Sequence, residues 1–248
     1  MSNIRPIEIV YGNCTLRGAR FIGGDRGSVL LVHGFSDTRT GSGRMFVDLA
    51  RRLVRAGFSV ISFDRAGHGE SDGRFLDVNV PDEIEQLAVM LDHLDRPAHC
   101  IGHSLGAMEL AQLASREPAR FLSLSLLAPA ASSVDEIANG MIMGEPFDRI
   151  TTDEPFDLGG QALGPAFVEG MRDFDPYAGI ERYRGPAFLH HGEQDEIVAL
   201  ACSRRYRDIW PQARLTTYRN TDHGWHNLQA RQRLFDVIEA DLMACEKG

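Results

Sequence analysis

The sequence predicts an α/β fold with a mostly parallel central sheet, helices on both faces and a small inserted cap. Short apolar runs alternate with amphipathic segments, and this alternation requires crossover connections between parallel strands. This alternation is absent from residues 130–184, called the insertion below, which contain Gly, Pro, Asp and scattered aromatic residues. A compact domain rarely contains a structureless loop of that length, so we expect short elements there that form the cap. We therefore predict a single domain over residues 1–248, with residues 130–184 as a cap insertion.

The elements are expected in a regular order. An antiparallel pair opens the chain, at residues 7–11 and 15–21, with its turn at Gly12-Asn13. The next strands are apolar runs of the kind covered on both faces, at 28–32, 58–63, 98–101 and 122–127. Helical spacing of apolar residues appears between them, at 45–56, 80–94 and 104–116. After the insertion the rhythm resumes with a strand at 187–191, a helix at 199–210, a strand at 214–218 and a helix at 228–244.

Length and composition narrow the class of protein. The chain has 248 residues, 43% hydrophobic and 25% charged, as expected of a soluble globular protein with a substantial core. A net charge of −9 without any basic run argues against a nucleic-acid partner. The amino terminus lacks the apolar core of a signal peptide, and no window approaches a membrane span. The cysteines show no metal-ligand spacing, so we expect reduced thiols, a cytoplasmic location and no metal site.

The segment Gly102-His103-Ser104-Leu105-Gly106 joins a predicted strand directly to a predicted helix. Such a junction makes a sharp, strained turn, and glycines are needed where a Cβ would collide with the crossing backbone. The serine at its apex would stand beside the helix N-terminus, where partial positive charge favours a developing anion. Ser104 is therefore the candidate nucleophile. An ordinary glycine-containing turn is the alternative interpretation, and the rest of the chain decides between the two.

A serine nucleophile needs a base, a group that orients the base, and donors for an oxyanion. Asp195 follows the strand at 187–191, and His223 follows the strand at 214–218. Both residues are thus expected at the carboxyl ends of parallel strands, where active sites collect. The chain order Ser, Asp, His also fits a strand–turn–helix nucleophile. We predict that Ser104 is the nucleophile, His223 the base and Asp195 the acid.

Other residues could compete for these roles. His226 is an alternative base, but it is expected at the start of the last helix rather than in the loop. Asp222 and Glu196 are alternative orienting groups that we expect to be exposed. The remaining histidines considered are expected in or beside core elements or the turn: His93, His99, His103, His190 and His191.

The oxyanion donors are expected to be two backbone N–H groups, those of Leu105 and Phe35. Phe35 belongs to the loop His33-Gly34-Phe35, called the 33–35 loop below, which follows the strand at 28–32. Gly34 allows a close turn, and His33 is expected to fix the loop by hydrogen bonding. The nearby segment 64–73 is rich in glycine but lacks both G-x-G-x-x-G spacing and a Walker lysine. We expect it to be a structural loop rather than a nucleotide site.

These motifs together resemble the α/β-hydrolase superfamily over essentially the whole chain. In that superfamily the 33–35 loop, residues 64–71, residues 102–106, Asp195 and His223 correspond to the oxyanion loop, a structural turn, the nucleophile elbow, the acid and the base. The short opening pair, the segment Gly69-Glu70-Ser71-Asp72-Gly73 and the modest cap are similar to cinnamoyl and feruloyl esterases. The chain differs from that group at Leu105, where Gln is common, and at Ala107, where a third Gly is common.

The resemblance implies a carboxylic-ester hydrolase that acts through an acyl-enzyme, with no metal or organic cofactor. The expected partner is a small-molecule ester, and aromatic side chains in the insertion favour an aromatic, hydroxycinnamate-type substrate. The same triad could instead serve C–C bond cleavage, thioester hydrolysis or perhydrolysis. A ligand-sensing receptor of the same fold is a further alternative. The sequence does not predict the oligomeric state.

Overall fold

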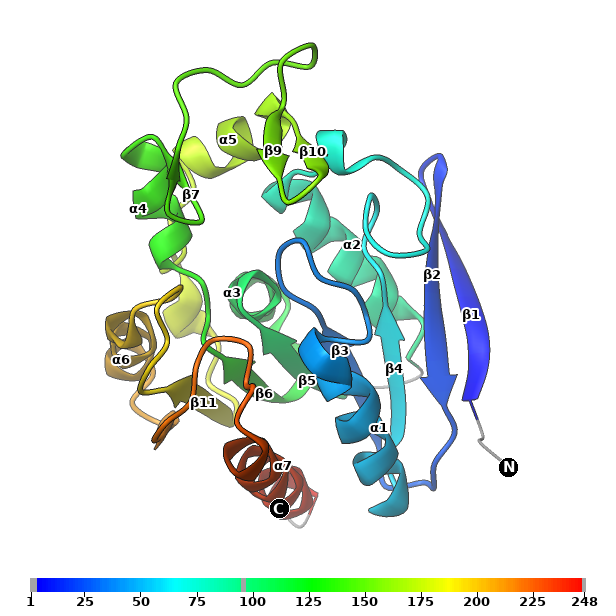
Figure 1. Ribbon diagram of the computed structural model, residues 1–248. Helices are drawn as coiled ribbons and strands as arrows, with labels where there is room; N and C mark the ends of the chain where they lie inside the picture. The colour runs from blue at the N-terminus through cyan, green and yellow to red at the C-terminus, as the bar shows by residue number, and fades with distance from the viewer. Residues whose placement is uncertain (1–3, 95–96, 247–248) are drawn as a thin grey trace.

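Eight strands form one central sheet in the computed structural model, which describes residues 4–94 and 97–246 (Figure 1). They are β1 (Ile4–Tyr11), β2 (Cys14–Phe21), β3 (Ser28–Val32), β4 (Ser59–Phe63), β5 (Ala98–His103), β6 (Phe121–Leu127), β11 (Ala187–Gly192) and β12 (Arg214–Tyr218). Their order across the sheet is β1-β2-β4-β3-β5-β6-β11-β12. The pairs β1–β2 and β2–β4 are antiparallel, and all the other neighbouring pairs in this sheet are parallel. The predicted mostly parallel sheet is confirmed.

The opening pair is longer than the sequence predicted. Strand β1 begins at Ile4 rather than Ile7, and its register runs from Ile4 opposite Phe21 to Tyr11 opposite Cys14. Pro6 concealed this start because a proline cannot donate to a ladder. It is tolerated here because β1 is the edge of the sheet, where one row of backbone groups needs no partner.

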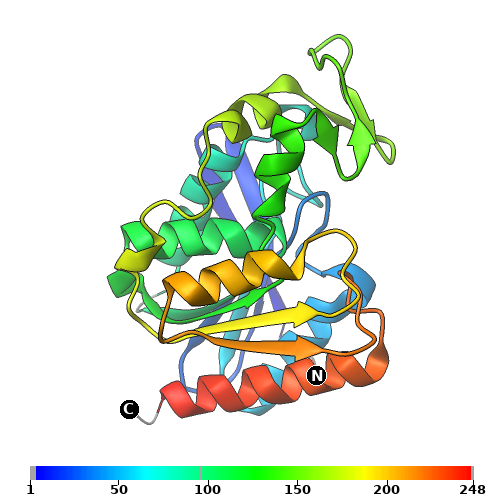
Figure 2. The ribbon, with the colours of Figure 1, turned by 90° about the vertical axis from the view of Figure 1, so that its left-hand side faces the viewer.

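Helices cover both faces of the sheet. On one face lie α1 (Met45–Arg55) and α7 (Leu228–Cys245), and on the other lie α2 (Val80–Asp92), α3 (Leu105–Arg116) and α6 (Leu200–Ile209). Figure 2 shows α7 beneath the sheet, with α3 and α6 above it. Successive side chains of a strand point to opposite faces. Accordingly Leu30 of β3 is buried in the layer under α2 and α3, and Leu31 in the layer over α1 and α7.

The insertion leaves the sheet after β6 and returns at β11, and its part from α4 to α5 lies at the top of Figures 1 and 2. Its elements are α4 (Ser132–Ala138), β7 (Met141–Ile142), β8 (Glu145–Pro146), β9 (Phe156–Leu158), β10 (Gln161–Leu163), α5 (Pro165–Arg172) and the 3₁₀ turn η4 (Ile180–Arg182). Helix α5 packs on α2, and η4 packs on α3. The other 3₁₀ turns are η1 (Ser42–Arg44), η2 (Phe75–Asp77) and η3 (Pro118–Arg120).

Among the helices of residues 4–94 and 97–246, none has the combined length and apolar character required to cross a membrane.

Asn79 and Asn227 each cap the start of a helix, and Asn79 makes an additional hydrogen bond to the insertion. Asn79 caps α2 by accepting the backbone N–H of Asp82 at 3.3 Å, and its Nδ2 donates to the carbonyl of Ala166 in α5 at 3.0 Å. Asn227 caps α7 by accepting the backbone N–H of Ala230 at 3.0 Å. Asn79 therefore ties α5 to α2 in addition to capping its own helix.

We expect Asn227→Ala to lower the free energy of unfolding by about 1 kcal/mol, which is typical for the loss of a cap. We expect Asn79→Ala to lower it by about 2 kcal/mol, because a second hydrogen bond of about 1 kcal/mol is also lost. Chemical denaturation of both variants measures the difference. Equal losses would contradict the tether between α2 and α5.

Candidate active site

Ser104 stands at a sharp turn between β5 and α3, with a backbone φ of 56° and ψ of −120°. This positive φ costs a residue with a side chain about 1–3 kcal/mol. A Cβ at position 102 would lie 2.8 Å from Cα of Ala107, and one at position 106 would lie 2.3 Å from the carbonyl oxygen of His33. Real Cβ atoms do not make such contacts, so Gly102 and Gly106 are required, as the sequence predicted.

The structure brings Ser104, His223 and Asp195 together at the carboxyl edge of the sheet. Nε2 of His223 lies 2.9 Å from Oγ of Ser104, and Nδ1 lies 2.7 Å from Oδ2 of Asp195. A carboxylate accepts hydrogen bonds, so the proton of the neutral ring sits on Nδ1. Nε2 is then free to accept the hydroxyl proton of Ser104.

The carboxylate of Asp195 is buried and held by backbone donors. Its Oδ1 accepts the N–H groups of Ile197 at 3.0 Å and Val198 at 2.8 Å. Burial by itself raises the pKa of Asp195, but the hydrogen bond and charge of His223, together with the N–H of Val198, outweigh it. The net pKa lies below the ordinary value, so Asp195 is ionised at neutral pH.

His103 packs against the imidazole of His223, with ring centroids 4.7 Å apart. Its Nε2–H donates to the backbone carbonyl of His223 at 2.9 Å. Burial, reinforced by the nearby His223, lowers the pKa of His103 to about 3. His103 is thus a neutral residue that supports the backbone of His223, in line with the expectation that it packs near the turn.

A second Ser–His–Asp set lies on the surface nearby. Nδ1 of His226 is 2.7 Å from Oδ2 of Asp222, and its Nε2 is 3.2 Å from Oγ of Ser42. The side chains of His226 and Asp222 are 64% and 48% exposed, so water competes for every bond in this set. Helix α7 begins at Leu228, so the expectation that His226 starts that helix was wrong. Variants of Ser42 and His226 can therefore serve as controls for variants of Ser104 and His223.

The alternative acid Glu196 is exposed, as expected. Three of the remaining histidines are buried and hydrogen-bonded: His99 to Ser123, His190 to Tyr218, and His191 to Ser203 and Val198. His93 is exposed and directly follows α2, so it lies beside a core element as expected.

Phe35 and Leu105, the predicted donors, line one pocket with Ser104. Leu105 is the first residue of α3, so its N–H has no partner within the helix. The loop 64–73 is structural, since the buried carboxylate of Asp64 accepts the backbone N–H groups of Arg39 at 2.6 Å and Glu70 at 3.1 Å. This agrees with the expectation of a bracing loop.

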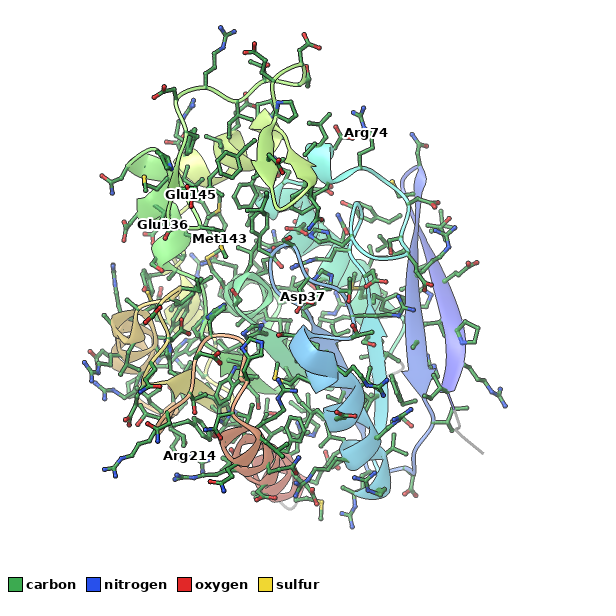
Figure 3. The ribbon with its side chains drawn as sticks, viewed as in Figure 1. Asp37, Arg74, Glu136, Met143, Glu145 and Arg214 are labelled. Atoms are coloured by element: carbon green, nitrogen blue, oxygen red, sulfur yellow. The ribbon has the colours of Figure 1, made fainter. Side chains whose placement is uncertain are left out.

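The pocket beside Ser104 is narrow, with a cavity volume of about 30 Å³. Its other lining residues are Phe35, Leu105, Ala130, Ser132, Ser133, Glu136, Met143, Phe167, Ile197 and Val198. The rings of Phe35 and Phe167 stack at 4.5 Å and form an aromatic wall. Figure 3 shows Glu136 and Met143 together on the α4 side, where Glu136 accepts the backbone N–H of Met143 at 3.1 Å.

No group of three or more His, Cys, Asp or Glu side chains is arranged to hold a metal ion within the part of the chain that the structure describes. Cys14, Cys100, Cys202 and Cys245 are all free thiols.

A model of the alpha/beta hydrolase family matches residues 29–237. A non-heme chloroperoxidase from Kitasatospora aureofaciens is 24% identical over 239 residues, which cover 79% of this chain and 84% of that protein. A monoacylglycerol lipase from Mycolicibacterium smegmatis is 25% identical over 212 residues, covering 72% of this chain and 74% of that protein.

Among solved structures, the complex of ferulic acid with Est1E from Butyrivibrio proteoclasticus superposes with a TM-score of 0.89. It is 20% identical in sequence and covers 98% of this chain and 100% of that one. At this identity the likeness establishes a shared fold.

The buried histidines predict a loss of stability in acid. Burial lowers the pKa of His103 and of His190 to about 3, whereas an unfolded histidine titrates near about 6.5. Below that pH the unfolded chain binds protons that the folded chain does not. The free energy of unfolding therefore falls as pH falls from about 6.5 towards 3, by up to about 1.4 kcal/mol per pH unit for each histidine.

We expect His103→Gln to flatten this decline between pH 6.5 and 5 by about 1 kcal/mol per pH unit, because one buried titrating group is removed. Urea unfolding at pH 7, 6 and 5 measures the slope. An identical slope in His103→Gln and the parent would show that residue 103 is not held neutral.

Proposed function

This chain belongs to the alpha/beta hydrolase family, and we propose that it hydrolyses carboxylic esters through an acyl-enzyme on Ser104. One observation carries the proposal. The imidazole of His223 lies within hydrogen-bond distance of both the hydroxyl of Ser104 and the carboxylate of Asp195. That arrangement suits general-base activation of a serine and serves no evident packing purpose.

In the first half-reaction, Nε2 of His223 takes the proton of Ser104 while Oγ attacks the ester carbonyl carbon. The backbone N–H groups of Phe35 and Leu105 donate to the resulting oxyanion. The C–O bond to the alcohol then breaks, and protonated His223 gives its proton to the leaving oxygen. Asp195 holds the tautomer of the ring and stabilises its positive form.

In the second half-reaction, water loses a proton to His223 and attacks the acyl carbon on Ser104. A second oxyanion forms and collapses with cleavage of the bond to Oγ. The acid is released, and the proton returns from His223 to Ser104. The donors, base and acid are the same in both halves, so no further group is needed.

Substrate class is also part of the proposal. The aromatic wall of Phe35 and Phe167 favours an apolar or planar acyl group. The structurally similar Est1E binds ferulic acid in its complex, and we therefore propose a hydroxycinnamate-type ester as the specific substrate. We further propose that residues 130–184 act as a cap within a single domain, because Phe167, Met143 and Glu136 of this segment line the pocket.

Perhydrolysis is the second candidate, favoured by the similarity to a chloroperoxidase. Hydrogen peroxide would replace water as the second nucleophile, and the acyl-enzyme would yield a peracid. The ratio of peracid to acid formed in the presence of peroxide separates the two reactions.

We also propose that the protein is cytoplasmic, because all four of its cysteines are free thiols.

We expect Ser104→Ala to lower kcat for p-nitrophenyl esters by about 10³- to 10⁶-fold with the fold intact, because the nucleophile is gone. His223→Ala should cause a loss of similar order. The surface set provides controls, since Ser42→Ala and His226→Ala should change kcat by less than about twofold. Near-normal turnover by Ser104→Ala, with a circular dichroism spectrum that matches that of the parent, would contradict the proposed mechanism.

The charge of the pocket predicts a preference for uncharged acyl chains. Glu136 lines the pocket, and its described lining contains no Lys or Arg. A like charge a few ångströms from this carboxylate costs about 1–2 kcal/mol, or about tenfold in rate. Esters with a terminal carboxylate on the acyl chain should therefore be poor substrates.

We expect Glu136→Gln to raise kcat/KM about tenfold for a p-nitrophenyl ester with a terminal carboxylate, and less than about twofold for its neutral analogue. Steady-state kinetics on the two esters gives the ratio. Glu145→Gln is the matched control, because Glu145 lies on β8 and does not belong to the residues that line the pocket. An unchanged ratio in Glu136→Gln would exclude this carboxylate as a specificity determinant.

A further inference from the structure

A fully buried guanidinium lies beside the 33–35 loop. Nη2 of Arg65 donates to the carbonyl oxygen of Gly34 at 2.9 Å. Its Nη1 donates to the carboxylate of Glu109 on α3, and its Nε lies 2.9 Å from Oε1 of Glu83 on α2. All three charged side chains are at most 1% exposed. One side chain therefore connects the loop after β3 with two helices.

Stability alone gives little reason for this cluster. Burial raises the pKa of Glu109 well above its ordinary value, against the opposing charge of Arg65 and with the support of Glu83. A buried ionic cluster costs desolvation, and apolar residues of similar volume often stabilise a core as well or better. A geometric role would explain why polar side chains occupy this place.

The cluster fixes the orientation of one peptide group. Nε2 of His33 accepts the backbone N–H of Arg65 at 3.2 Å, so the ring proton is on Nδ1, which donates to the Gly34 carbonyl at 2.8 Å. Two donors thus hold that carbonyl oxygen. In a trans peptide the carbonyl and the following N–H point in opposite directions. The N–H of Phe35 is consequently turned away from the cluster.

The same guanidinium holds the other proposed donor through α3. Glu109 lies four residues after Leu105, one turn along the same helix. Its bond to Arg65 therefore ties the start of α3 to the Gly34 carbonyl. We propose that Arg65 is a positioning residue that sets the spacing between the N–H groups of Phe35 and Leu105. This inference rests on the proposed function, which assigns these groups to the oxyanion.

A positioning role makes a specific kinetic prediction. Oxyanion donors bind the transition state more strongly than the bound ester, so their displacement lowers kcat and leaves KM nearly unchanged. Lysine carries its donors on one compact nitrogen and lacks the planar fork of arginine. Arg65→Lys should keep the positive charge but lose the simultaneous bonds to Gly34 and Glu109.

We expect Arg65→Lys to lower kcat for a p-nitrophenyl ester by about 10- to 100-fold, with KM within about threefold of the parent. A trifluoromethyl ketone forms an anionic adduct with the serine, so its inhibition constant should rise by the same factor as kcat/KM falls. The control is Arg39→Lys, which alters a neighbouring ion pair with Asp64 and leaves the bonds of Arg65 to Gly34 and Glu109 in place. Its kcat should stay within about twofold.

Two results would overturn the inference. One is a folded Arg65→Lys protein that keeps more than about a fifth of the parent kcat, and the other is a change confined to KM. If Arg65→Lys does not fold, Glu109→Leu and Glu109→Gln decide. Gln keeps an acceptor for Nη1 and Leu does not, so a kcat loss confined to Glu109→Leu supports the inference and equal kcat values overturn it.

Ser104→Ala, measured in the same assay, separates this inference from the function on which it rests. If Ser104→Ala retains turnover, the proposed function fails. If Ser104→Ala is inactive while Arg65→Lys keeps its kcat, the positioning role of Arg65 alone fails.

Discussion

The site depends on the close approach between the turn at Ser104 and the end of β3. At Gly106 the backbone lies so near the carbonyl of His33 that a Cβ would be 2.3 Å away. This approach puts the start of α3 beside the 33–35 loop, and the same turn holds Ser104 at a positive φ. This backbone contact therefore brings the proposed nucleophile and both proposed donors into one place, and Arg65 is proposed to set the spacing of the donors.

The base and the acid come from the opposite half of the sheet. Parallel pairing of β6, β11 and β12 brings their carboxyl ends to the edge where Ser104 stands. The acid and the base are each held in place by a neighbouring histidine that takes no part in the proposed reaction. His191 bonds the carbonyl of Val198, whose N–H holds Asp195, and His103 bonds the carbonyl of His223. In the proposed reaction, these contacts of His191 and His103 position Asp195 and His223.

Features that depend on residues close together in the sequence could be predicted from the sequence alone. Apolar runs and amphipathic spacing yielded the parallel sheet, and the glycines at 102 and 106 identified the turn. The Arg65 cluster was missed because its carboxylates lie in helices, where a glutamate usually faces solvent, and no local signal marks Glu83 or Glu109 as buried. The strands of the insertion were missed for another reason. With two or three residues each, β7 to β10 are too short to show a period.

If Ser104 is the nucleophile, as we propose, its hydroxyl oxygen holds the acyl group between the two half-reactions. Mass spectrometry of protein quenched in acid during turnover of a p-nitrophenyl ester detects such an adduct. We expect an acyl adduct on the peptide that contains Ser104 in the parent, and none in a variant without that hydroxyl. An adduct on another residue such as Ser42, or turnover with no covalent adduct at any time point, would contradict it.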